Sequence, residues 1–192
     1  MFHKRFANIA IQIFVLAFIL QPINTFSNPP FGGKIEARLL EVQSNVTTQP
    51  DLLDTLLMVS KHWKPSLNLD QLKEEMEKLT LSVRKKLKGQ DEPEDIIRIL
   101  RTIIHDEAGY GYTDQVDERG VPINPEELFL HGLLDTRKGY CMNLSLIYLI
   151  LGQKLGLPLY GVALPNHFFV RFEKGKLQIN IETTEGGVSY PD

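Results

Sequence analysis

One side chain in this sequence has the chemistry of a catalytic nucleophile. Cys141 is the only cysteine among the 192 residues, and it follows a glycine turn at the start of a long apolar segment. A thiol in the first turn of a helix lies at the positive end of the helix dipole, and Arg137 and Lys138 stand just upstream. We therefore expect a lowered pKa for this thiol and a reactive thiolate. Further along the chain, His167 and Glu182 complete a candidate Cys–His–Glu triad.

The pattern after residue 166 predicts a hairpin that brings this histidine and this acid together. Apolar side chains occupy alternate positions on two strands, at Phe168, Val170, Phe172, Leu177, Ile179 and Ile181. Either a two-residue Lys174-Gly175 turn or a four-residue turn over 173–176 places Phe172 opposite Leu177, and counting back places His167 opposite Glu182. Opposed side chains have β-carbons about 5 Å apart, so the carboxylate can orient the imidazole. Such a pair is also a common surface ion pair, which contributes under about 1 kcal/mol.

Helical periodicity predicts the elements that must hold this site. Three apolar stripes have helical spacing, and each ends at a helix-breaking residue: 51–64 before Pro65, 68–88 before Gly89, and 93–108 before Gly109. A polar loop over 109–125 and a helix or turn over 126–134 lead to the helix that begins at Cys141. That helix is apolar on nearly every side, which is typical of a central core element, and Gly156 ends it.

The segment 1–27 has the pattern of an export signal. Lys4 and Arg5 precede an apolar run that ends at Gln21-Pro22, and Ser27 marks a candidate cleavage position. The run is shorter than the roughly 20 residues of a membrane span, so we expect a signal peptide over 1–27, with an uncleaved anchor as the alternative. We expect a loose segment rich in Pro and Gly over 28–47 and one domain over 48–192.

Composition narrows the class of partner. A hydrophobic fraction of 43% and a charged fraction of 23% are ordinary for a globular protein. The formal charge of −3 provides no basic footprint for nucleic acid.

Export would place the domain in the periplasm or outside the cell, with membrane attachment only if the first segment is uncleaved. In such an oxidising compartment a lone cysteine cannot form an internal disulfide, so its presence calls for another explanation. An inert buried cysteine is the alternative.

Two segments carry a resemblance to a known family. These are LFLHGLLDTRKGYCMNLSLIYLILGQKLGLPLYGVALPNHFFVRFE and NIETTEGG, in which the Gly-Leu-Pro-Leu-Tyr-Gly-Val turn and the Pro-Asn-His-Phe-Phe-Val-Arg strand are the most distinctive pieces. The chain resembles the SirB-type branch of the transglutaminase-like superfamily, whose fold is papain-like. The resemblance implies an α+β domain: an amino-terminal helical cluster and a central nucleophile helix packed on a small antiparallel sheet.

Position by position, the resemblance gives Cys141 the place of the nucleophile, His167 that of the base and Glu182 that of the acid. Two points bear on this assignment. Some relatives in this branch lack the thiol, whereas this chain has it. The acid in related domains is often Asp, and Glu is one methylene longer. Relatives often continue beyond the Gly186-Gly187 region, so the domain is expected to be truncated at its carboxyl end.

The chemistry expected of these residues is covalent acyl transfer at an amide or ester bond, with a peptide or protein as substrate. The backbone N–H of Cys141 would be one oxyanion donor, and the loop over 109–125 would supply a second. Water as acceptor gives a peptidase or amidase, and an amine gives protein crosslinking. The alternatives are a non-catalytic peptide- or protein-binding module with a vestigial thiol, and a zinc site formed by Cys141, His167 and Glu182. Their spacing matches no short zinc motif, so we expect no metal and no cofactor.

Overall fold

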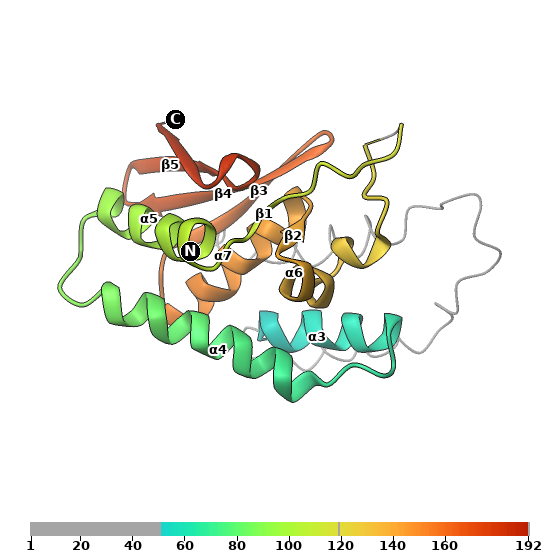
Figure 1. Cartoon of the computed structure of the whole chain (residues 1–192). Coiled ribbons are helices and arrows are strands. Elements are labelled where there is room, and N and C mark those ends of the chain that lie inside the picture. Colours follow the sequence, from blue (N-terminus) through green and yellow to red (C-terminus); the bar gives the residue numbers. More distant parts are fainter. Residues whose placement is uncertain (1–50, 119, 192) are drawn as a thin grey trace, which may run out of the picture. The chain divides into compact units, whose positions relative to one another are not determined.

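The apolar helix that begins at Cys141 is the centre of the domain (Figure 1). The computed structural model describes residues 51–118 and 120–191. Helix α7 (Cys141–Leu155) contacts α3 and α4 as well as strands β3 and β4. Helices therefore cover one side of α7 and the sheet covers the other (Figure 1). The fold is α+β, as expected.

The amino-terminal helices begin and end close to where the sequence places them. They are α3 (Leu52–Trp63), α4 (Leu69–Lys86) and α5 (Pro93–Arg101), which continues as one π-helical segment, η1 (Thr102–Glu107). The side chain of Asn68 caps α4 by accepting hydrogen bonds from the N–H groups of Asp70 and Gln71, at 3.1 and 3.3 Å. The predicted signal over 1–27 and the loose segment over 28–47 lie outside the described residues. Within the described part of the chain, no helix combines the length and apolarity that a membrane crossing needs.

The stretch before α7 contains more structure than the predicted polar loop. It holds β1 (Gly111–Tyr112), a 3₁₀ turn η2 (Pro125–Leu128), α6 (Leu130–Thr136) and β2 (Lys138–Gly139). Strands β1 and β2 pair in parallel, with Tyr112 beside Gly139. Strands as short as these cannot show an alternating pattern, so the sequence could not predict this pairing.

The last part of the chain forms a four-stranded antiparallel sheet in the order β3-β4-β5-β6. Its elements are β3 (Leu159–Leu164), β4 (His167–Lys174), β5 (Leu177–Glu182), the 3₁₀ turn η3 (Thr183–Glu185) and β6 (Val188–Pro191). The side chains of Phe168, Val170 and Phe172 on β4 are buried, and so are Ile179 and Ile181 on β5. The predicted core face of the hairpin is confirmed at these five positions, but Leu177, beside the turn, is 40% exposed.

The predicted register of this hairpin is wrong by two residues. Val170 lies opposite Ile181, and Lys174 lies opposite Leu177, so the turn consists of Gly175 and Lys176 alone. Gly175 has φ of +66°, a backbone conformation that glycine adopts without strain, and tight hairpin turns need it at their first central position. A shift of two keeps every side chain on its predicted face, because side chains alternate with a period of two.

Candidate active site

The amino terminus of α7 enters the sheet where β4 and β5 separate. The ladder between these strands ends at Val170 and Ile181. Beyond that point the polar groups of Phe168 bond to α7: its carbonyl oxygen lies 3.3 Å from the Ser145 hydroxyl, and its backbone N–H hydrogen-bonds to the Cys141 sulfur. The start of α7 therefore takes the place of a neighbouring strand, which leaves the backbone of Phe168 satisfied.

Ser145 ties this junction together from one turn further along α7. Its hydroxyl lies 2.8 Å from the carbonyl oxygen of Cys141 and 2.9 Å from Oγ1 of Thr183, at the start of η3. Both Ser145 and Thr183 are fully buried. A buried polar network of this kind is stabilising only when its members are satisfied, so it fixes the helix start against β4 and η3 together.

The structure brings His167 and Glu182 into direct contact. His167 Nε2 donates a hydrogen bond of 2.6 Å to Oε2 of Glu182. The contact is diagonal rather than directly across the ladder, because the register differs from the predicted one. Diagonal neighbours lie about 7–8 Å apart at the backbone, so the extra methylene of glutamate helps the carboxylate to reach.

Glu182 is held in its ionised form by a second set of bonds. Its Oε1 accepts hydrogen bonds from the backbone N–H of Thr184 at 3.0 Å and from the Thr184 hydroxyl at 2.6 Å. Burial opposes ionisation, but the bonds from Thr184 and from the His167 ring prevail and lower the pKa of Glu182. An ionised acceptor at Nε2 keeps the proton of a neutral imidazole there, so Nδ1 presents its lone pair. This Nδ1 has no hydrogen-bond partner among residues 51–118 and 120–191.

The environment of Cys141 differs from the one predicted. The residue is only 7% exposed, and burial raises the pKa of its thiol, as does the negative charge of Glu182. Hydrogen bonds from the backbone N–H groups of Phe168 and Met142 act in the opposite direction without reversing the result. The resting thiol is therefore protonated at neutral pH, and the predicted low pKa is wrong.

One of the two upstream cations is engaged elsewhere. The guanidinium of Arg137 lies 4.6 Å from the centre of the Tyr110 ring, and the same side chain forms an ion pair with Glu75. Arg137 therefore ties the end of α6 to α4 and the β1 region. Nearness in sequence suggested an effect on the thiol that the fold does not produce.

Two tyrosines lie beside the start of α7, Tyr140 as the residue before Cys141 and Tyr112 opposite Gly139. The rings of Tyr112 and Tyr140 have centroids 5.7 Å apart and are tilted by 31°. Burial raises the pKa of both phenols, and the neighbouring Cys141 raises them further. Tyr112 is 38% exposed, so its phenol borders both the thiol environment and solvent. Tyr112 comes from the 109–125 stretch, where the sequence predicts a second oxyanion donor.

Asn143 fixes the entry into α7. Its Oδ1 accepts a 2.6 Å hydrogen bond from the backbone N–H of Tyr140. Its Nδ2 donates to the carbonyl oxygens of Glu127 and Phe129, in the chain that leads into α6. Sequence reasoning missed this residue, although an amide side chain three positions after a helix cap is a recognisable signal. It also missed Ser145 and Thr184, for which the sequence offers no comparable signal.

The three candidate residues do not form a metal centre. Across the described ranges, 51–118 and 120–191, no group of three or more His, Cys, Asp and Glu side chains is arranged to hold a metal ion. Instead, one ring nitrogen of His167 and one carboxylate oxygen of Glu182 are hydrogen-bonded to each other.

Comparison with known proteins decides the family. The family model described as "Transglutaminase-like superfamily" matches residues 70–191, a stretch that includes Cys141, His167 and Glu182. The chain belongs to the transglutaminase-like superfamily. This membership agrees with a central helix packed against a small antiparallel sheet.

Individual relatives are distant. F-box only protein 21 of Mus musculus and that of Homo sapiens are each 33% identical over 79 residues, which is 40% of this chain and 13% of theirs. A UPF0162 protein of Xylella fastidiosa is 25% identical over 152 residues, which is 71% of this chain and 48% of that protein. The chain thus spans about an eighth of the F-box relatives and about half of the UPF0162 protein. No solved structure matches significantly.

Proposed function

We propose that this transglutaminase-like domain is a thiol-dependent acyl-transfer enzyme, with Cys141 as nucleophile, His167 as base and Glu182 as the acid that orients the base. The observation that carries the proposal is the 2.6 Å bond from His167 Nε2 to Glu182, which leaves Nδ1 as a proton acceptor. His167 directly precedes Phe168, whose backbone N–H bonds to the Cys141 sulfur. The base at the start of β4 and the nucleophile at the start of α7 therefore lie on two elements that contact each other.

A protonated resting thiol sets the order of the proposed steps. As the sulfur attacks the carbonyl carbon of an amide or ester, its proton passes to Nδ1 of His167. The imidazolium is stabilised by ionised Glu182 and returns the proton to the leaving amine or alcohol as the carbon–nitrogen or carbon–oxygen bond breaks. The resulting thioester on Cys141 is then resolved by water or by an amine, and the free thiol is regenerated.

The negative oxygen of the tetrahedral intermediate needs hydrogen-bond donors. The backbone N–H of Cys141 lies in the first turn of α7, where N–H groups have no partner within the helix. The Tyr112 hydroxyl is the candidate second donor, because Tyr112 pairs with Gly139, two residues before Cys141, and its side chain borders solvent.

The test is acylation by an activated ester. With p-nitrophenyl acetate, we expect a burst of nitrophenol and an acetyl thioester that mass spectrometry locates on Cys141. His167→Ala should lower the burst rate by roughly 100-fold or more, because a positioned base contributes about 10²–10⁴ in rate. His62→Gln, a change at a histidine on α3, is the control and should leave the rate unchanged. An unchanged burst in His167→Ala, or an acetyl group on another residue, would remove the base or the nucleophile from the proposal.

A second candidate is a non-catalytic peptide- or protein-binding module. It is favoured by the 7% exposure of Cys141 and by the raised pKa of its thiol, which are also the properties of an inert buried cysteine. In that case the activated ester would give no burst in the wild-type protein, and Cys141→Ala would bind peptide partners as well as the wild type.

The wider setting forms part of the same proposal. We infer a peptide or protein substrate, membership of the SirB-type branch, and export directed by residues 1–27, with no nucleic acid partner. Expression of the full chain followed by cell fractionation and amino-terminal sequencing tests the export. A mature protein that begins near residue 28 is the expected result, and an intact amino terminus in the cytosol would contradict it.

A further inference from the structure

A pocket lies at the opposite end of α7 from the thiol. It has a volume of about 340 Å³, and its walls come from the end of α4, the turn that follows it, and the end of α7 with the turn into β3. Because α7 has 15 residues, this pocket is roughly 20 Å along the helix from Cys141. The volume falls at the lower end of the range for small-molecule sites, about 300–1,000 Å³.

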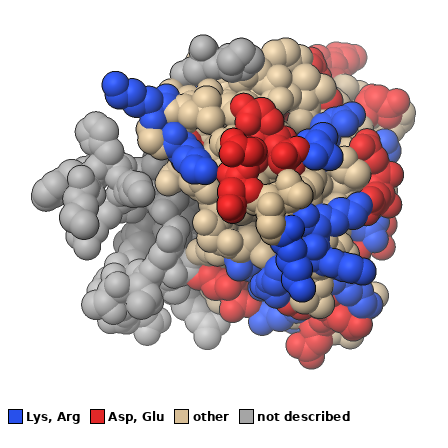
Figure 2. Space-filling model, turned by 90° about the vertical axis from the view of Figure 1, so that its left-hand side faces the viewer, with Lys and Arg blue, Asp and Glu red and all other residues tan. Residues whose placement is uncertain are grey.

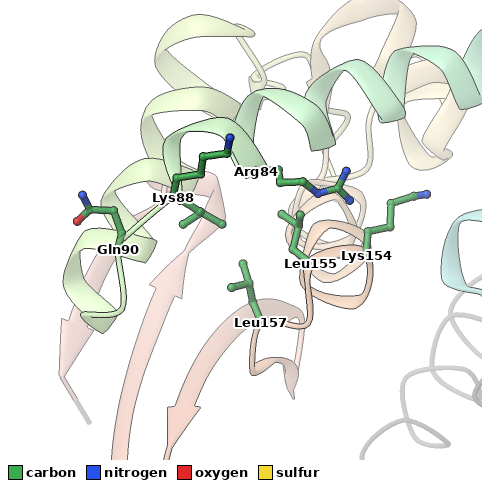
Figure 3. Close-up of a pocket in the computed structure, with 7 residues that line it drawn as sticks. Arg84, Lys88, Gln90, Lys154, Leu155 and Leu157 are labelled. Carbon is green, nitrogen blue, oxygen red and sulfur yellow. The ribbon is translucent and has the colours of Figure 1, made fainter.

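The lining of this pocket combines apolar walls with basic side chains. Leu87, Leu155 and Leu157 line it and are half-buried. Of these, Leu155 and Leu157 point into the hollow (Figure 3). The basic side chains at the rim are Arg84, Lys88 and Lys154 (Figure 3). One face of the domain shows Lys and Arg side chains gathered in one area, with acidic side chains beside them (Figure 2).

Two of the three cations have no acidic partner among the described residues. No ion pair involves Arg84 or Lys88 in the part of the chain that the structure describes, and Lys154 makes one contact of 3.6 Å with Glu77. Elsewhere on α4, Lys78 pairs with Glu74 and Lys86 with Glu107. Within the part of the chain that the structure describes, Arg84 and Lys88 therefore place two uncompensated positive charges at the pocket rim.

Helix dipoles explain part of this charge but not all of it. Both α4 and α7 end near the pocket, and cations near helix carboxyl ends are stabilising. Each helix end contributes roughly −0.5 elementary charge and Glu77 offsets one cation, so the three cations leave an excess of about +1. Dipole compensation also gives no reason for a hollow lined by three leucines.

We propose that this pocket binds a phosphate monoester that carries a short apolar group. A phosphate monoester has a charge of about −1.5 to −2 at neutral pH, opposite in sign to the excess charge at the rim. Arg84 matches phosphate geometry through its planar guanidinium, and Lys88 and Lys154 act as point charges beside it. The apolar group packs against the three leucines. This binding is independent of the proposed acyl transfer.

Calorimetric titration of the full chain with hexyl phosphate tests the site. We expect saturable binding of one molecule per chain, at least tenfold weaker binding of methyl phosphate because it buries less apolar surface, and no binding of hexanol. In the double variant Arg84→Gln/Lys88→Gln the affinity should fall at least tenfold. Lys85→Gln removes a neighbouring charge on the same helix that does not line the pocket, and it should stay within about twofold of the wild type.

A second experiment with lipid vesicles distinguishes a lipid headgroup from a free small molecule as the source of the phosphate. Binding to phosphatidic acid vesicles, with none to phosphatidylcholine vesicles and a loss in the double variant, would identify the phosphate as a lipid headgroup. Binding to hexyl phosphate alone would identify a free small molecule. Because all three substituted positions are exposed at the end of α4, circular dichroism should show that every variant is folded. Failure to bind in every arm, or an equal loss in Lys85→Gln, would overturn the proposal.

Discussion

At the scale of single residues, the thiol and the acid are tuned in opposite directions. Burial raises the pKa of Cys141, whereas bonds from Thr184 and His167 keep Glu182 ionised. A preformed thiolate–imidazolium pair would require the thiol to ionise at rest. The geometry instead favours transfer of the proton during attack, so the protonation of His167 is linked to the chemical step.

This difference can be measured through the pH dependence of alkylation. Iodoacetamide reacts with the thiolate, so its rate rises with pH as the thiol ionises. The midpoint for Cys141 should lie above about 8.5, the ordinary value, because the folded environment raises the pKa. Glu182→Gln removes a negative charge that disfavours the thiolate, so the midpoint should fall. A wild-type midpoint below about 7 would show that the helix dipole and the imidazole outweigh burial.

The role of Tyr112 is separable from the reactivity of the sulfur itself. Acylation passes through an oxyanion and alkylation does not. Tyr112→Phe should therefore slow the burst with p-nitrophenyl acetate by roughly 10- to 100-fold and leave the rate with iodoacetamide unchanged. Tyr160→Phe on β3 is the matched control. Equal slowing of both reactions would mean that Tyr112 positions the helix start and donates nothing to the oxyanion.

At the scale of elements, the site depends on the turn that follows β5. Gly187 has φ of +75°, and its N–H bonds to the carbonyl oxygen of Glu182 at 2.9 Å. A β-carbon at this position would lie 2.3 Å from the Tyr148 hydroxyl and 3.1 Å from the His105 ring. His105 Nε2 and this hydroxyl are 3.0 Å apart, so the turn packs against a hydrogen-bonded pair, half-buried at His105 and buried at Tyr148, that links η1 to α7.

Alanine substitutions at Gly186 and Gly187 can distinguish the cost of backbone strain at positive φ from the cost of a steric clash of the added β-carbon. Gly187→Ala should lower the free energy of unfolding by more than about 2 kcal/mol and also reduce acylation, because the turn that carries Glu182 must move. Gly186→Ala shares the left-handed backbone, with φ of +69°, but its β-carbon meets no described atom within 4 Å. It should cost about 1–2 kcal/mol, the cost of strain alone. Equal losses in urea unfolding would indicate that the close approach at Gly187 is relieved easily.

At the scale of the whole domain, one helix is shared by the helical layer and the sheet. Ile147 on α7 is fully buried, and α7 contacts α3, α4, β3 and β4. A helix that is buried on nearly all sides cannot lose contact with one layer while keeping the other. The domain should therefore unfold as a single cooperative unit.

Ile147→Ala tests this coupling. We expect a loss of about 2–5 kcal/mol in the free energy of unfolding, which is typical for a large side chain truncated in a core. Helical circular dichroism and tyrosine fluorescence should report the same midpoint in urea. The control is Leu81→Ala on α4, at a residue that is 51% exposed. This control should change stability by less than about 0.5 kcal/mol. Separate midpoints for the two probes would show that the layers unfold independently.

The sequence by itself determined the limits of the long helices and the faces of β4 and β5. Asn68, Pro93 and Gly156 act on their own backbone neighbours, so helix limits follow from local chemistry. Alternation along β4 and β5 identified the buried face, because side-chain direction has a period of two regardless of the partner strand. The same parity placed His167 and Glu182 on the opposite face.

Only the tertiary structure decided the register, the junction and the state of the thiol. A shift of two residues leaves the alternating pattern unchanged, so the register between β4 and β5 is set by the turn at Gly175. The pKa of Cys141 depends on how deeply α7 is buried between β4 and η3, which the local sequence does not encode. Arg137 is close to Cys141 in sequence but pairs with Glu75 in space. Electrostatic effects follow distance and burial in the folded chain, and those are set by packing between segments far apart in the sequence.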